Sequence, residues 1–199
     1  MERNLRVVGT ATKKCSPDTA KIYMNLEAVG KTADLAKSIF TNKSTLLTNI
    51  IKQLGFNPED LRTENFFVDK NYEYTDNKRV QNGYKADCTY SLVIDLDYAV
   101  LEQLITSLSQ ALEMRITYDV MLREAEKEEK EVLDLAIQDA KQKAEVVASS
   151  CGVKLGDIVG ISYDEAPSFA GFRAVSSESN LAPSDVKITK SIEIMWEIK

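Results

Sequence analysis

Apolar and polar residues alternate along several segments of the chain, and this alternation predicts strands with one buried face. From Lys21 to Ala28 every second residue is apolar, which is typical of a half-buried strand. The same period of two runs from Tyr84 to Leu96 and from Val186 to Ile198. At about 3.3 Å per residue, the strand from Tyr84 to Leu96 reaches about 40 Å. Further strands are predicted at 5–12, 61–74, 116–122 and 158–163.

Three other segments have apolar residues at spacings of three and four, and we expect them to be helices. The first follows Thr32, a good N-cap residue, and stops at Gly55. The second follows Asp97 and runs to about 112, and the third covers roughly 126–151 before Gly152. The residues expected to face the core are Leu35, Ile39, Leu46, Leu47, Ile50, Ile51 and Leu54, then Leu101, Leu104, Ile105, Leu108 and Leu112, then Leu133, Ile137, Ala140, Ala144, Val147 and Cys151.

The order of these elements contains an internal repeat. The run from Gly55 to Leu61 joins a helix to a strand, and the run from Gly152 to Ile158 does the same with an equal Gly-to-Asp spacing. We therefore expect an α+β fold in which two β-α-β-β-type repeats, with long and mainly antiparallel strands, pack against helices. Residues 1–199 would form one domain, with repeats at about 19–96 and 114–199 joined by a helix at 97–112. The alternative is coincidence, because many helices end in glycine before a strand.

The helices should cover the apolar strand faces and leave the strand edges open. Strands this long expose unpaired backbone groups at the sheet edges, where another chain can pair, so we expect at least a dimer. The faces expected to be covered carry Ile22, Met24 and Leu26, then Tyr84, Cys88, Leu92 and Ile94, then Ile192, Ile194 and Trp196.

Composition excludes several classes of function. The net charge is −6 and the only basic doublets are Lys13-Lys14 and Lys78-Arg79, so we expect no nucleic-acid partner. No run approaches the roughly 20 apolar residues of a membrane span. The chain has no secretory leader at its start, so the expected location is cytoplasmic as given, and periplasmic or envelope for a chain from which a leader was removed.

The residues needed for common catalytic and metal sites are missing. The chain has no histidine, no phosphate-binding glycine loop and no Cys-x-x-Cys pair, so we expect no enzyme activity and no cofactor or metal. The acidic run from Glu124 to Glu131 is interpreted as a solvated helix start. Three widely spaced cysteines argue against a disulfide framework and fit a reducing compartment.

Each cysteine has its own expected environment. Cys88 and Cys151 fall on apolar faces, so we expect both thiols to pack in the core. Cys15 lies beside Lys13 and Lys14 in a turn, and we interpret it as an idle surface thiol. The alternative is a redox-responsive Cys15 whose thiolate is favoured by the nearby positive charge.

Two groups of residues are candidates for protein contacts. Tyr72 and Tyr74 precede a hairpin tip at 75–78, although tyrosines in such places often only pair across the strands. Phe169, Phe172 and Arg173 lie within the Pro- and Ser-rich run 164–185, which we expect to be a contact loop without a regular element. The alternative is that the phenylalanines fold back onto their own sheet.

Several stretches together resemble the SIMPL-domain family, which includes bacterial periplasmic immunogenic proteins and a eukaryotic member associated with a kinase of inflammatory signalling. The resemblance implies an α+β fold, large homo-oligomers in some bacterial members, and roles in envelope or oxidative-stress physiology. It implies no catalytic residue. The stretches are Val7 to Thr10, Ser16 to Ala20, Thr32 to Ala36, Leu54 to Phe56, Asp60 to Thr63, Gly83 to Ala86, Ala136 to Glu145, and Gly152.

These observations lead to two hypotheses about function. The first is a non-enzymatic SIMPL-type protein that forms homo-oligomers or binds other proteins, linked to stress or envelope physiology. The second is a small-molecule binding protein or a carboxylate-dependent hydrolase that uses a cleft between the two repeats. A polar cleft with clustered, desolvated carboxylates would favour the second hypothesis.

Overall fold

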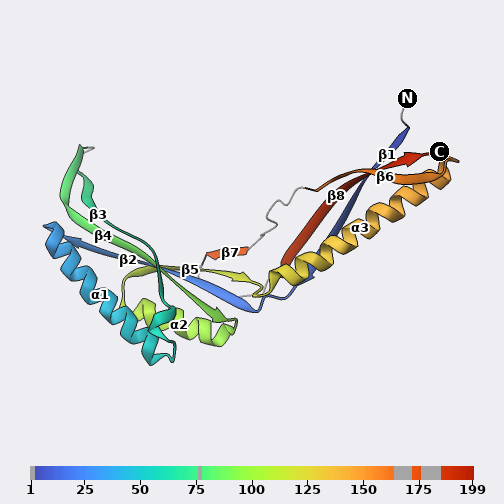
Figure 1. Ribbon diagram of the computed structural model, residues 1–199. Helices are drawn as coiled ribbons and strands as arrows, with labels where there is room; N and C mark the ends of the chain where they lie inside the picture. The colour runs from blue at the N-terminus through green and yellow to red at the C-terminus, as the bar shows by residue number, and fades with distance from the viewer. Residues whose placement is uncertain (1–2, 76–77, 164–171, 176–184) are drawn as a thin grey trace. The chain divides into compact units, whose positions relative to one another are not determined.

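A computed structural model describes residues 3–75, 78–163, 172–175 and 185–199, and confirms the predicted α+β class (Figure 1). None of the helices in these ranges is both long and apolar enough to cross a membrane. The elements are β1 (Asn4–Cys15), β2 (Thr19–Gly30), α1 (Ala33–Gln53), a short 3-10 helix (Pro58–Asp60), β3 (Arg62–Thr75), β4 (Lys78–Asp95), α2 (Tyr98–Ala111), β5 (Met114–Met121), α3 (Ala125–Ser150), β6 (Leu155–Ser162), β7 (Phe172–Val175) and β8 (Val186–Ile198).

The chain divides into two compact units. The first, here called the terminal unit, comprises Met1–Pro17, Met121–Phe172 and Pro183–Lys199. The second, the central unit, comprises Asp18–Val120 and Arg173–Ala182. The predicted pair of repeats at 19–96 and 114–199 stays a prediction.

The central unit contains a five-stranded sheet in the order β3-β4-β2-β5-β7. β2 pairs with β4 in an antiparallel register from Thr19↔Asp95 to Gly30↔Tyr84. One face packs with α1 and α2 into a single apolar core, as the alternation predicts. The predicted caps are also confirmed, since Thr32 accepts a hydrogen bond from the Leu35 amide and Asp97 accepts from two amides of α2. The sheet residues in this core include the predicted Ile22, Met24, Leu26, Cys88, Leu92 and Ile94, with Tyr84 partly buried against it.

The predicted core face of α1 was partly wrong. Leu35 and Leu46 are exposed, while Ala36 and Phe40 are buried together with the expected Leu47, Ile50 and Ile51. The reason lies at the end of β2, where a Cβ on Gly30 would stand 2.5 Å from the Ala36 backbone nitrogen. Because the sheet approaches the helix so closely there, a small side chain faces it and Leu35 turns outward.

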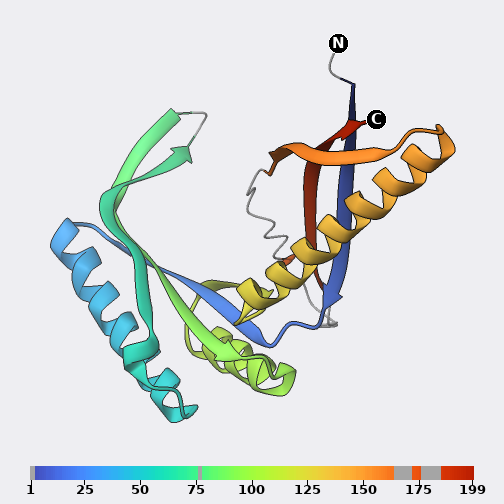
Figure 2. The same ribbon diagram turned by 45° about the vertical axis from the view of Figure 1, so that its right-hand side comes forward.

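The terminal unit contains a three-stranded antiparallel sheet, β1-β8-β6, with α3 packed on one face (Figure 2). Ile192, Ile194 and Trp196 are buried under the helix, as predicted. β1 and β8 pair along their whole length, from Asn4↔Glu197 to Cys15↔Val186.

The buried stripe of α3 is rotated relative to the predicted one. Ala140 and Ala144 are buried as expected, but Val147 and Cys151 are exposed. A Cβ on Gly9 would lie 2.1 Å from the Ala136 carbonyl oxygen, so the helix touches the backbone of β1. Only an alanine-rich face permits this approach, which is why a stripe of small residues faces the sheet in place of the bulkier one. The buried residues are Val132, Ala136, Ala140, Ala144 and Ala148.

The run 164–185 was expected to contain no regular element, and this was wrong for one part of it. Phe172–Val175 form strand β7, which lies next to β5 at one edge of the five-stranded sheet. The error has a physical cause, because an edge strand needs only a neighbouring strand and not the apolar alternation that identifies a buried one.

Core packing in the central unit can be tested with two adjacent substitutions. Leu92 is 1% exposed, so Leu92→Ala should lower the free energy of unfolding by about 2–5 kcal/mol. Val93 points to the opposite face and is 48% exposed, so Val93→Ala should change it by less than about 1 kcal/mol. Urea denaturation of both variants measures the difference, and equal effects would contradict the assigned faces.

Helix packing in the terminal unit can be tested with two glycines. Gly9→Ala should destabilise the protein by about 1–3 kcal/mol or more, because the added methyl group overlaps the α3 backbone. Gly160→Ala is the matched control, since its Cβ would meet only Met195 at 3.7 Å, and its effect should stay within about 0.5 kcal/mol. A tolerated Gly9→Ala in thermal or urea unfolding would show that α3 does not lie on β1.

Candidate functional site

The hairpin of β3 and β4 extends beyond the rest of its sheet. The last β2–β4 pair is Gly30↔Tyr84, but β4 continues to pair with β3 through Tyr72↔Gln81 and Tyr74↔Arg79. We call this extension, residues 70–75 and 78–83, the ribbon; it is visible at the upper end of the hairpin in Figure 1. Within the described part of the chain no third strand pairs with it.

A bulge at Gly83 sets the direction in which the ribbon side chains point. The pairing moves from Lys70↔Tyr84 to Tyr72↔Gln81, so β4 contains one extra residue at this point. Gly83 has φ +85, and a Cβ there would lie 2.4 Å from the Gly30 carbonyl oxygen. The extra residue places Gln81 and Arg79 opposite Tyr72 and Tyr74 and on the same side as Tyr84, which is the side of the sheet that α1 and α2 cover.

The ribbon exposes residue types that are typical of protein interfaces. Tyr72 is 38% exposed and Tyr74 is 78% exposed. Tyr72 does not pair with another tyrosine, because Arg79 places its guanidinium carbon 3.8 Å from the centre of the Tyr72 ring. Tyrosine and arginine are enriched among the residues that contribute most to binding between proteins. The two tyrosines were predicted as contact residues from the sequence, whereas Arg79 was recognised only as part of a basic doublet.

The other predicted contact residues lie elsewhere. Phe169 is outside the described residues. Phe172 and Arg173 belong to β7, whose place in the strand order is at the opposite edge of the sheet from β3. The structure therefore brings Tyr72, Tyr74 and Arg79 together, but does not join them to β7.

A second feature of the central unit is a polar hollow on the sheet face that points away from the apolar core. Its volume is about 610 Å³ and its lining comes from three adjacent strands, β4, β2 and β5. The alternation predicted the polar faces of β2 and β4, but strand order cannot be read from spacing, so the contribution of β5 was missed. The lining residues are Tyr23, Asn25, Glu27, Asp87, Thr89, Arg115, Thr117 and Asp119.

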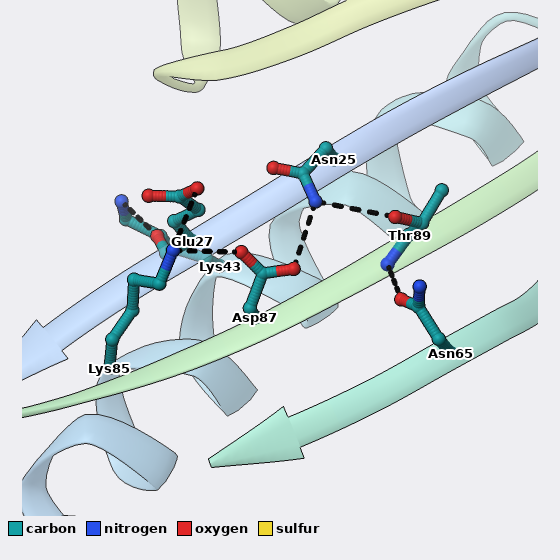
Figure 3. Close-up of polar contacts among 7 residues, drawn as sticks. All are labelled: Asn25, Glu27, Lys43, Asn65, Lys85, Asp87 and Thr89. Atoms are coloured by element: carbon teal, nitrogen blue, oxygen red, sulfur yellow. Dashed lines mark hydrogen bonds and ion pairs between the residues drawn. The ribbon is translucent and has the colours of Figure 1, made fainter. Parts of the chain in front are cut away.

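Two of the lining carboxylates are bound by a lysine next to the hollow (Figure 3). The Lys85 ammonium lies 3.2 Å from a carboxylate oxygen of Glu27 and 3.2 Å from Asp87 Oδ2. Burial disfavours the Lys85 charge, but hydrogen bonds to Glu27 and Asp87 outweigh that effect and raise the pKa of Lys85. Asp87 is buried, and this ion pair stabilises its charge there.

A hydrogen-bonded asparagine lies beside this ion pair. Asn25 Nδ2 donates to Asp87 Oδ1 at 3.0 Å and to Thr89 Oγ1 at 3.3 Å. On the far side of Thr89, its backbone amide donates to Asn65 Oδ1 at 2.9 Å (Figure 3). The polar face of the sheet is thus ordered by side chains that bond across neighbouring strands.

Asp119 has a different environment from the other lining carboxylates. Its Oδ1 atom is buried and has no hydrogen-bond partner among the described residues. No group of three or more His, Cys, Asp or Glu side chains in the described ranges is arranged to hold a metal ion.

The acidic start of α3 was predicted to be solvated, and this is confirmed for the exposed Glu124, Glu126 and Glu131 but wrong for the half-buried Glu128 and Glu129. Lys13 on β1 contacts Glu128 at 2.6 Å and Glu131 at 2.7 Å. Lys190 on β8 contacts Glu129 at 2.7 Å, and the Lys190 side chain is only 6% exposed. The sequence placed Lys190 on a strand and Lys13 in a turn, whereas β1 continues through Lys13 to Cys15, and it could not show which helix lies over them. The first turns of α3 are therefore ion-paired to both neighbouring strands.

Two of the three cysteine predictions were also wrong. Cys88 is buried as expected, but Cys15 is buried too and Cys151 is exposed. Burial raises the pKa of the Cys15 thiol, and its hydrogen bond to Glu128, 3.6 Å away, raises it further. The charge of Lys13 lowers this pKa, but by less than burial and the Glu128 contact raise it. Cys15 is the last residue of β1 on the side that faces α3, where it packs with Val132 and Ile188.

Comparison with known proteins gives a match along nearly the whole chain. A family model described as "SIMPL: Protein of unknown function (DUF541)" matches residues 5–196. A protein of Edwardsiella ictaluri (strain 93-146), described as "Uncharacterized protein YggE", is 27% identical over 160 residues. That match covers 78% of this chain and 65% of the relative, so it spans less than two thirds of the relative's length.

Thiol alkylation should distinguish the three cysteines. Cys151 should react with iodoacetamide at least about tenfold faster than Cys15 or Cys88, because burial raises the pKa of both buried thiols and the thiolate is the reacting form. Glu128→Gln should speed the reaction of Cys15 and lower its pKa, whereas Glu145→Gln on the exposed side of the same helix should not. Peptide mass spectrometry from neutral to mildly alkaline pH measures each rate. Equal rates for Cys15 and Cys151 at neutral pH would contradict the buried position of Cys15.

Proposed function

This chain belongs to the SIMPL family, as its sequence motifs predict, and from that premise we propose that it is a non-catalytic protein that acts by self-association. The expected link to stress or envelope physiology follows from the family resemblance. The ribbon of β3 and β4 is the observation that carries this proposal.

An isolated two-stranded ribbon is only marginally stable in water, because each strand has one neighbour and no covered face. In this protein the ribbon directs Tyr72 and Tyr74 to the side of the sheet that is apolar and helix-covered further along β4. A second chain that packs on that side would cover both rings and extend the core past α1. Such burial stabilises an assembly by about 25 cal/mol for each Å² of apolar surface that it removes from water.

Free sheet edges support self-association independently of the ribbon. β3 is an edge of the five-stranded sheet and β6 is an edge of the three-stranded one. Along β6, Ile158, Val159 and Ile161 are all exposed, with Ile161 at 63%, and Asp157 is the only charged residue. An exposed apolar edge with so little charge is a template for strand pairing with another chain. Both units thus have an edge that a copy of the chain can use.

The ribbon can be tested with the double substitution Tyr72→Ser and Tyr74→Ser. Loss of both rings should lower the average mass in light scattering at a given protein concentration, while the melting temperature of the dissociated chain changes little because the rings are exposed. The double substitution Leu35→Ser and Leu46→Ser is the matched control, since it removes two exposed apolar side chains from α1. The control should keep the mass of the wild-type protein. A wild-type chain that stays monomeric at every concentration, or a tyrosine variant with unchanged mass, would overturn the proposal.

A further inference from the structure

We propose that the polar hollow on β4, β2 and β5 binds a small organic cation with primary ammonium groups, such as an alkyl diamine. This inference does not depend on self-association through the ribbon. The volume of the hollow, about 610 Å³, lies within the usual range for small-molecule sites. The chemistry of the lining decides which class of ligand fits.

The orientation of the Asn25 side chain provides the hollow with an acceptor. An ionised carboxylate can only accept hydrogen bonds, so the atom of Asn25 that lies 3.0 Å from Asp87 must be the donor Nδ2. The carbonyl oxygen Oδ1 is then held on the other side of the amide, and Figure 3 shows it pointing away from both Asp87 and Thr89. It accepts no hydrogen bond from the described residues and lines the hollow as a free acceptor.

The Asp119 carboxylate has an oxygen, Oδ1, that lacks a hydrogen-bond partner among the described residues. A buried polar atom without a partner destabilises a fold by about 1–3 kcal/mol, and more when the group is charged. Asp119 Oδ1 is such an atom, yet the side chain as a whole is only partly buried and lines the hollow. The negative charge of a carboxylate is shared by both oxygens. A cation that contacts Asp119 from the hollow therefore also offsets the electrostatic cost of the buried Oδ1 atom.

The charges of the lining residues favour a cationic ligand. The lining carries three carboxylates, from Glu27, Asp87 and Asp119, and one guanidinium, from Arg115. Lys85 binds the first two but lies too far from Asp119 to form an ion pair with it. Within the lining itself three negative charges stand against one positive charge, so the hollow favours a cation over an anion.

A primary ammonium group suits these acceptors best. It has three donors and no acceptor, and the hollow presents the Asp119 carboxylate and Asn25 Oδ1 as acceptors without donors of their own. The Tyr23 ring adds an aromatic surface that already has the Lys21 ammonium 5.0 Å from its centre. The same ring can therefore attract a second cation or cover the methylene chain of a diamine.

Binding can be measured by isothermal titration calorimetry of the full chain with 1,4-diaminobutane. Butane-1,4-diol and succinate serve as neutral and anionic probes of the same length, and neither should bind. Asp119→Asn should weaken the diamine by about tenfold or more, because it removes a charged acceptor and keeps the shape. Asp134→Asn on the exposed surface of α3 makes the same change in net charge and should leave the affinity unchanged. Arg115→Gln should tighten binding, since it removes a like charge from the lining.

Chemical-shift changes in the wild-type protein give a readout that needs no variant. The diamine should shift the Asn25 side-chain amide and the backbone amides of Thr117 and Asp119, and leave those of α3 unchanged. No saturable heat with the diamine, stronger binding of succinate, equal effects of Asp119→Asn and Asp134→Asn, or weaker binding in Arg115→Gln would each overturn the proposal. Loss of diamine binding has no bearing on the mass of the assembly, so the two proposals fail separately.

Discussion

The contact between the backbones of Gly30 and Gly83 is the constraint on which the central unit depends. Gly30 ends β2, approaches the first turn of α1 at Ala36, and lies against the bulge of β4. A side chain on either glycine would collide with backbone atoms. The end of β2, the start of α1 and the bulge of β4 therefore meet only because both residues lack a Cβ. The end of β2 in turn determines where the sheet narrows to two strands. Gly30 therefore determines where the ribbon begins, and the bulge at Gly83 determines the side on which Gln81 and Arg79 lie.

The two faces of the five-stranded sheet have different chemical roles. One face packs with α1 and α2 and holds the chain together by apolar burial. The other holds side chains in place by hydrogen bonds and ion pairs between strands, as between Asn25 and Asp87. An apolar core tolerates small shifts of its side chains, whereas a hydrogen-bonded face fixes each donor and acceptor in direction. Selective recognition of a small molecule is thus expected on the polar face, and contacts between chains on the extension of the apolar one.

Local pattern predicted what depends on local physics. The alternation from Lys21 to Ala28 placed β2 correctly because a half-covered sheet requires it, and Thr32 and Asp97 were recognised as caps because their oxygens bond to amides two or three residues away. The residues that were misplaced depend on neighbours distant in sequence. The α3 stripe is shifted because Gly9 admits only alanines, and Cys15 is buried because α3 covers the end of β1. The hollow was not predicted at all, since nothing in the spacing of Arg115, Thr117 and Asp119 shows that β5 lies beside β2.

The ion pairs at the start of α3 imply that dissolved salt acts unevenly along this helix. The Lys13 side chain is about one third exposed, so mobile ions reach its contacts with Glu128 and Glu131 and weaken them. Lys190 is almost fully enclosed, and its contact with Glu129 is screened far less. Further along, the alanine face is held by the fit of backbone to backbone, on which ionic strength has little influence. Rising salt concentration should therefore weaken the contacts of the first turns of α3 with β1, while the contact with Lys190 on β8 persists. The helix should then separate from β1 first and not detach from the sheet as a whole.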